Sequence, residues 1–232
     1  MIAVATAAYN ESHCIVAVII ALGRCSMSIL PPTIPSSGIG DPPWEIATLF
    51  PPQGQWYESD YLALDTNRLV EFCDGRIEVL PMPSEQHQLI VKFLSRKMDD
   101  HIVAHQLGTL LFAPLRLRLR ADKIREPDIL FVLTENSHLR GPKYWSGADL
   151  VVEVVSEDDP DRDLKTKRTE YAVANIPEYW IVDPRDETVT VLTLPEGENQ
   201  YTEAGKYTAG QQAASVLLAG LVVDVREAFS QA

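Results

Sequence analysis

The fold is indicated most clearly by the stretch Glu126-Pro127-Asp128-Ile129-Leu130-Phe131-Val132-Leu133. In it, Asp128 directly precedes an apolar run that is typical of a buried strand. A second run, Leu150-Val151-Val152-Glu153-Val154-Val155-Ser156, carries an acid inside the apolar pattern. Burial of an unpaired carboxylate costs on the order of several kcal/mol, so each acid needs a cation. Asp128 and Glu153, on what we expect to be neighbouring strands, therefore predict a divalent-cation site.

The expected ion is Mg²⁺ or Mn²⁺, because hard cations prefer carboxylate and carbonyl oxygens. The backbone carbonyl of Val154 is the natural third ligand beside Asp128 and Glu153. Such an ion can activate water and offset charge on a reacting phosphate. The alternative is purely structural: each acid pairs with an arginine at a strand end, as Arg125 and Asp128 could.

A polar helix expected over 163–174 follows the second acidic strand and carries Lys165, Lys167 and Arg168. Phosphodiester hydrolysis benefits from a cation near the attacking water and the non-bridging oxygen, and lysine is long enough to reach back to the strand. The alternative is a solvated helix face.

Leucine and arginine alternate from Leu115 to Arg120, which is the period-2 pattern of a half-buried strand. The pattern puts Arg116, Arg118 and Arg120 on one strand face, where they could track a phosphate backbone. A solvated strand face is the equally open alternative.

Composition places the 232-residue chain among ordinary globular proteins, with 46% hydrophobic and 23% charged residues. The net charge of −13 argues against a protein that coats nucleic acid non-specifically. Residues 116–168 hold 11 basic and 11 acidic residues, so the candidate site lies in a neutral part of the chain, which permits a polyanionic substrate.

The three cysteines are widely spaced and form no CxxC pair, which favours a reducing, cytoplasmic location. The apolar run 14–22 is too short for a membrane span and lacks the positive residues that precede a signal-peptide core. Seven prolines between 31 and 52 are typical of a linker. We expect residues 1–45 to form a poorly structured extension and 46–232 to form the folded domain.

The remaining pattern predicts a helix, antiparallel strands, a helix and a strand, which together indicate a three-layer α/β arrangement with a mixed sheet. The first hairpin turns at Asp-Gly, and Ser84 caps the long helix. The expected helices are 59–64, 85–105, 163–174 and 225–229, and the expected strands are 69–72, 77–80, 109–113, 115–119, 127–133, 150–155, 178–182, 188–194, 201–207 and 221–223.

Several of these motifs together resemble the Uma2 family of restriction-endonuclease-like domains. The resemblance covers about 57–194 and rests on Pro127-Asp128, Glu153-Val-Val-Ser156, Asp163, Lys167, Tyr171 and Ile176-Pro-Glu-Tyr-Trp-Ile-Val-Asp-Pro184, with Leu69-Val-Glu71-Phe-Cys-Asp74-Gly75-Arg-Ile-Glu78, Pro81, Met82, Pro83, Ser84 and His87 upstream.

The resemblance implies a PD-(D/E)XK nuclease-like fold, in which Asp128 matches the first acid and Glu153 the second. The sequence departs from the plain motif, because Val155 stands where lysine is expected. In Uma2-like chains the lysine is moved onto the following helix, where Lys167 matches best and Lys165 is the second candidate. The resemblance also suggests accessory roles for Glu71 and His87, whose plainer interpretations are a hairpin ion pair and a helix-start residue. For His87 we favour the plainer one.

Other residues of the stretch from Ile176 to Pro184 are expected to have structural roles. Tyr179 and Trp180 lie in an apolar strand and are expected in the core, and Asp183-Pro184 is expected to end that strand as a turn.

We therefore expect a restriction-endonuclease-like α/β/α fold with a largely antiparallel central sheet, and an Mg²⁺-dependent endonuclease acting on DNA. A homodimer suits cleavage of both strands, and no organic cofactor or membrane is expected. The first alternative is an inactive nuclease-like scaffold that binds nucleic acid or a protein. The second is an acid–base hydrolase such as a glycosidase.

Overall fold

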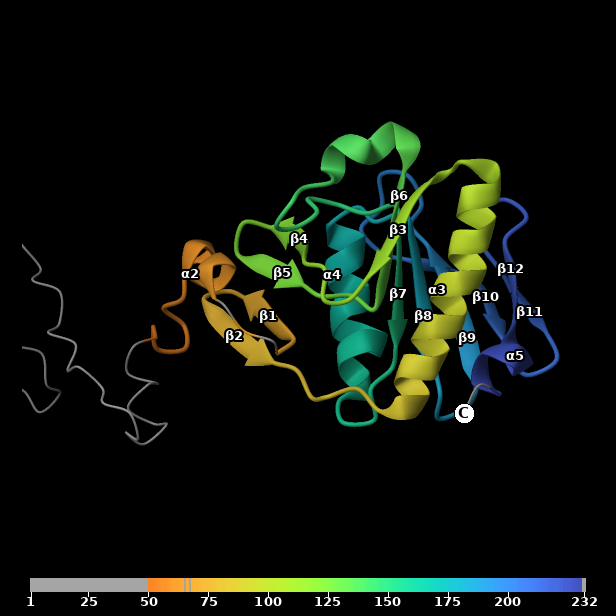
Figure 1. Cartoon of the computed structure of the whole chain (residues 1–232), viewed down its shortest axis with the longest axis horizontal. Coiled ribbons are helices and arrows are strands. Elements are labelled where there is room, and N and C mark those ends of the chain that lie inside the picture. The colour runs from red at the N-terminus through yellow and green to blue at the C-terminus, as the bar shows by residue number, and fades with distance from the viewer. Residues whose placement is uncertain (1–49, 65, 67, 231–232) are drawn as a thin grey trace, which may run out of the picture. The chain divides into compact units, whose positions relative to one another are not determined.

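The computed structural model describes residues 50–64, 66 and 68–230 (Figure 1). The chain divides into two units, Met1–Pro51 and Pro52–Ala232, and the fold below is that of the second unit. The expected extension over 1–45 lies outside the described residues.

A six-stranded sheet forms the centre of the unit (Figure 1). Its order is β10-β9-β8-β7-β6-β3, in which β7 pairs with β8 in parallel and the other neighbours are antiparallel. The prediction of a mixed, largely antiparallel sheet is therefore confirmed. The strands are β3 Gly108–Phe112, β6 Ile129–Leu133, β7 Leu150–Val154, β8 Glu178–Asp183, β9 Thr188–Thr193 and β10 Thr202–Tyr207.

Helices cover both faces of this sheet, as the three-layer prediction requires. The long helix α3 (Glu85–His105) packs on one face, and Ser84 caps it by accepting the backbone N–H of His87. A π-helical segment, Arg162–Lys167, runs into α4 (Arg168–Val173) on the other face. Successive side chains of β7 alternate between the two cores, so Val152 and Val154 face α3 whereas Val151 faces α4. Glu153 shares the α4 side with Val151.

The C-terminal segment completes the α3 side of the core. The hairpin of β11 (Gln212–Ala214) and β12 (Val222–Asp224) leads into α5 (Val225–Phe229). Ala213, Val223 and Phe229 belong to the same apolar cluster as α3.

A second, four-stranded sheet with the order β2-β1-β5-β4 supports a smaller core. Tyr61 of the predicted helix, α2 (Glu58–Ala63), packs there against Phe72. The predicted hairpin turns at Asp74 and Gly75, both with positive φ, as an Asp-Gly turn requires. The strands are β1 Val70–Cys73, β2 Arg76–Val79, β4 Leu117–Arg120 and β5 Lys123–Arg125.

The structure differs from the predicted elements mainly where a segment is short. The expected strand 127–133 begins only at Ile129, and the three-residue strands β5 and β11 and the 3₁₀ helix Thr134–Leu139 were not predicted. Such short segments contain too few residues to display a periodicity. Within the described part of the chain, no helix has both the length and the apolar character needed to cross a membrane.

Candidate active site at the β6–β7 strand ends

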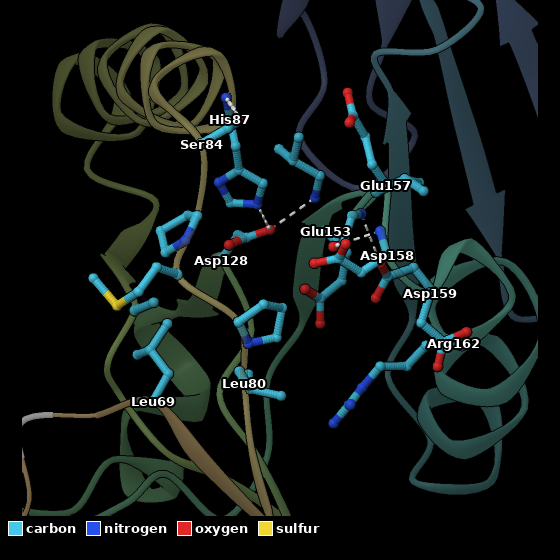
Figure 2. Close-up of a pocket in the computed structure, with 18 of the residues that line it drawn as sticks. Leu69, Leu80, Ser84, His87, Asp128, Glu153, Glu157, Asp158, Asp159 and Arg162 are labelled. Atoms are coloured by element: carbon cyan, nitrogen blue, oxygen red, sulfur yellow. Dashed lines mark hydrogen bonds and ion pairs between the residues drawn. The ribbon is translucent and has the colours of Figure 1, made fainter.

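The two acids singled out in the sequence meet at one cleft (Figure 2). Ile129 pairs with Val152 in antiparallel register, so the preceding Asp128 and the following Glu153 come opposite one another. The cleft has a volume of about 260 Å³ and is also bordered by the start of α3 and by the π-helical segment.

Asp128 is held through one of its two carboxylate oxygens. Its Oδ2 accepts the backbone N–H of Val154 at 2.8 Å and lies 3.2 Å from Nε2 of His87. Because N–H and C=O of a strand residue point to the same side, the Val154 carbonyl faces the same edge as Asp128.

Glu153 is buried, with 3% of its surface exposed, and is also engaged through one oxygen. Its Oε1 accepts the Tyr171 hydroxyl at 2.5 Å and lies 2.9 Å from Nζ of Lys167. Burial raises the pKa of the Glu153 carboxyl, and the charges of Asp163 and Asp128 add to the rise, whereas Lys167 opposes it. The pKa stays raised although Lys167 opposes the rise, so Lys167 alone does not keep the carboxyl fully ionised near neutral pH.

Lys167 is a buried cation surrounded by acids. Besides Glu153, its Nζ lies 3.0 Å from Oδ1 of Asp163 and 3.9 Å from Oε1 of Glu71. Burial by itself lowers the pKa of Lys167, but these carboxylates outweigh it and raise the pKa above its usual value. Lys167 therefore stays protonated. Lys165, the second candidate, points away: its side chain is 73% exposed and pairs with Asp161 at 2.8 Å.

Glu71 anchors a network of arginines behind the cleft. It is fully buried and pairs with Arg125 at 2.7 Å and with Arg162. Burial raises the pKa of Glu71, but Lys167, Arg125 and Arg162 together lower it to about 2. Arg125 also binds Glu170 at 2.8 Å, so the alternative in which Arg125 pairs with Asp128 does not hold. The partner of Asp128 is His87.

His87 starts α3, as expected, but its ring does more than begin a helix because it contacts Asp128. Burial lowers the pKa of His87, and the hydrogen bond and charge of Asp128, with Glu153 and the Val154 backbone, outweigh it and raise the pKa. Its Nδ1 is buried and has no partner among the described residues.

The three arginines of the 115–120 stretch do not form a shared track. A register shift separates Arg118 from Arg120, and Arg116 precedes β4. Arg118 pairs with Glu58 at 2.9 Å and Arg120 pairs with Asp74. Arg116 lies 4.5 Å from the centre of the Tyr61 ring and 3.5 Å from Glu126. None of the three lines the cleft.

The donor set suits a hard divalent cation. Within the described part of the chain, the contacts of Asp128 with His87 and Val154 use Oδ2, and the contacts of Glu153 with Tyr171 and Lys167 use Oε1. Oδ1 of Asp128 and Oε2 of Glu153 take no part in these contacts. No group of three or more His, Cys, Asp or Glu side chains in the described residues is placed to hold a metal. Two carboxylates and the Val154 carbonyl would leave the remaining coordination positions of the ion to water molecules, several of which Mg²⁺ usually retains.

Asp163 and Tyr171, which orient Lys167 and Glu153, received no separate role in the sequence analysis. Their signal is the four-residue spacing Asp163, Lys167 and Tyr171, which puts all three on one helix face. Tyr179 and Trp180 are fully buried, as expected, and Asp183 ends β8 and binds Arg185.

Comparison with known proteins adds two similarities. A family model named Uma2 and described as "Putative restriction endonuclease" matches residues 58–226. Among solved structures, the chain is similar to a "putative nuclease belonging to DUF820" from Anabaena variabilis ATCC 29413, with a TM-score of 0.60 and 17% identity over 75% of this chain and 98% of that one. At that identity the likeness establishes a shared fold. No curated protein matches the chain.

Proposed function

The chain belongs to the Uma2 family, whose model covers residues 58–226, and from this premise we propose that it is a metal-dependent endonuclease that hydrolyses phosphodiester bonds in DNA. The observation that carries the proposal is the meeting of Asp128 and Glu153 on paired strands, with Nζ of Lys167 2.9 Å from Glu153. Acid, acid and lysine at one cleft are the groups that such hydrolysis requires.

Asp128, Glu153 and the Val154 carbonyl would hold Mg²⁺ or Mn²⁺. When bound, the ion supplies a nucleophilic water at neutral pH and offsets charge on the phosphate. His87 and the Val154 N–H hold Asp128 through Oδ2, so Oδ1 would be the oxygen that binds the ion.

Lys167 acts as a proton-bearing cation and not as a general base. Its raised pKa keeps it charged, so it donates hydrogen bonds to the attacking water or to a non-bridging oxygen. Asp163 and Glu153 hold its ammonium in place, and the Tyr171 hydroxyl holds Glu153.

The test is cleavage of plasmid and single-stranded DNA in Mg²⁺, Mn²⁺ or EDTA. We expect metal-dependent cleavage by the parent protein and a loss of at least about 100-fold in Asp128→Asn and in Glu153→Gln. The matched controls are Asp99→Asn on α3 and Glu203→Gln on β10, both of which are exposed. Cleavage at the parent rate by either site variant would overturn the assignment.

A catalytically inactive scaffold is the second candidate, and one observation favours it. Lys167 pairs with both Glu153 and Asp163, so the fold supplies these buried acids with a cation of its own. Calorimetric titration with Mn²⁺ separates the two: the endonuclease binds the ion and loses it in Asp128→Asn, whereas the scaffold binds none.

The homodimer stays a prediction and is part of this proposal. Two clefts related by a two-fold axis suit the cleavage of both strands of a duplex. Sedimentation of the parent protein with and without DNA measures the assembly.

A further inference from the structure

The cleft has two walls of different chemistry. The segment after β2 contributes Leu80, Pro81, Met82 and Pro83, and Leu69 lies beside it. The segment after β7 contributes Glu157, Asp158 and Asp159 to the facing wall, and Figure 2 shows these acids across the cleft from Leu69 and Leu80. Met82 is 74% exposed, so this wall carries uncovered apolar surface.

The charge of the cleft does not suit a duplex backbone. Of the described residues that line it, seven are acidic and two, Arg162 and Lys167, are basic. Both basic side chains are already paired with acids, Arg162 with Glu71 and Glu78 and Lys167 with Glu153 and Asp163. A duplex carries one phosphate charge per roughly 1.7 Å of its axis, about twice the density of one strand at roughly 3.4 Å, so a cleft whose described cations are already paired disfavours the duplex more than the single strand.

The dimensions and the apolar wall suit one unpaired nucleotide. The volume of about 260 Å³ lies near the lower end of small-ligand sites. The side chains of Leu80 and Met82 offer an apolar surface to the flat face of a base. Asp128 and Glu153 line the same cleft, and the divalent ion that they would hold is what would attract the phosphate.

We propose that the substrate is single-stranded DNA, with one unstacked base against the wall of Leu69, Leu80 and Met82 and its phosphate at Asp128 and Glu153. This inference rests on the proposed function for the position of the phosphate. No Phe, Tyr or Trp lines the described cleft, so the base would contact aliphatic side chains and not an aromatic ring.

The test is binding of one fluorescent oligonucleotide, single-stranded or annealed to its complement, measured by anisotropy in Ca²⁺. We expect the single strand to bind at least about tenfold tighter than the duplex. Met82→Ser should weaken single-strand binding about fivefold, because it removes apolar contact with the base. Val103→Ser is the matched control: Val103 is 67% exposed on α3 and lies outside the cleft, so binding stays unchanged.

Equal or tighter binding of the duplex, or an unchanged affinity in Met82→Ser, would overturn the inference. A parallel cleavage assay in Mg²⁺ and Mn²⁺ separates its failure from that of the proposed function. Preferential cutting of duplex DNA refutes only the single-strand inference. Met82-dependent binding of single strands without cleavage in either metal refutes only the endonuclease.

Discussion

At the scale of single residues, two lysines only two positions apart differ completely in environment. Lys167 is 5% exposed and surrounded by carboxylates, whereas Lys165 is solvated and makes one surface ion pair. The sequence ranks Lys167 first only through the family resemblance. The structure supplies a physical reason, because the Lys167 ammonium is the cation that compensates Glu153 and Asp163.

Replacement of Lys167 by methionine should destabilise the fold strongly, because it leaves two buried acids without their cation. We expect the free energy of unfolding to fall by about 3–5 kcal/mol in urea titrations. Lys165→Met is the matched control and should cost less than about 1 kcal/mol, since it loses one exposed pair. Equal losses in the two variants would show that Lys167 does not compensate the buried acids.

At the scale of elements, one buried carboxylate ties the C-terminal segment to the central sheet. Glu178 at the start of β8 accepts the Trp180 indole N–H at 2.7 Å and the Ser215 hydroxyl at 2.6 Å. It also accepts the backbone N–H groups of Val216 at 2.9 Å and Leu217 at 2.7 Å. The turn between β11 and β12 is therefore organised by a residue on another sheet.

Glu178→Ala should loosen this segment, because four donors lose their acceptor. We expect a loss of about 2–4 kcal/mol in thermal or urea unfolding. Hydrogen exchange should increase first at the amides of 215–218, near the missing carboxylate. The exposed Glu196→Ala is the control. If exchange rises uniformly along the chain instead, the carboxylate does not act as a local anchor.

At the scale of the whole molecule, stability should depend on the titration of a buried acid in the wall of the cleft. Glu126 is 6% exposed, and its carboxylate accepts the Val70 N–H at 3.1 Å. Burial raises its pKa to about 7 and, with a smaller contribution from the charge of Glu71, outweighs the lowering by the Val70 N–H and by Arg116. The folded state therefore holds this proton more tightly than the unfolded state does.

Because the pKa of Glu126 is raised in the folded state, its protonation contributes fully to stability below the unfolded pKa of 4.5. This contribution is lost as pH rises towards about 7. Glu126→Gln cannot ionise, so its stability relative to the parent should rise across this window. We expect a change on the order of 1–2 kcal/mol, since one pKa unit is worth about 1.4 kcal/mol and water screens part of the shift. Urea unfolding at pH 4.5, 6 and 7.5 measures it, with the exposed Glu203→Gln as control. A constant difference between Glu126→Gln and the parent would refute the shift.

Local patterns in the sequence were sufficient for most of the fold. The long helix with its Ser84 cap, the Asp-Gly hairpin and the two acid-bearing strands follow from periodicity and turn chemistry within a few residues. Asp128 and Glu153 were identified in the same way, because an acid interrupts an apolar run. These features depend on neighbours along the chain, which the sequence displays directly.

The tertiary structure alone determines which charged side chains form ion pairs with one another. Arg162 pairs with Glu71 across 91 positions, and Arg125 binds Glu71 and Glu170 but not Asp128. The apolar wall of Leu80 and Met82 faces the acids after β7 only because two sheets bring these segments together. Ion pairing depends on distances of a few ångströms between side chains far apart in the chain, and the folded packing of the sheets and helices sets those distances.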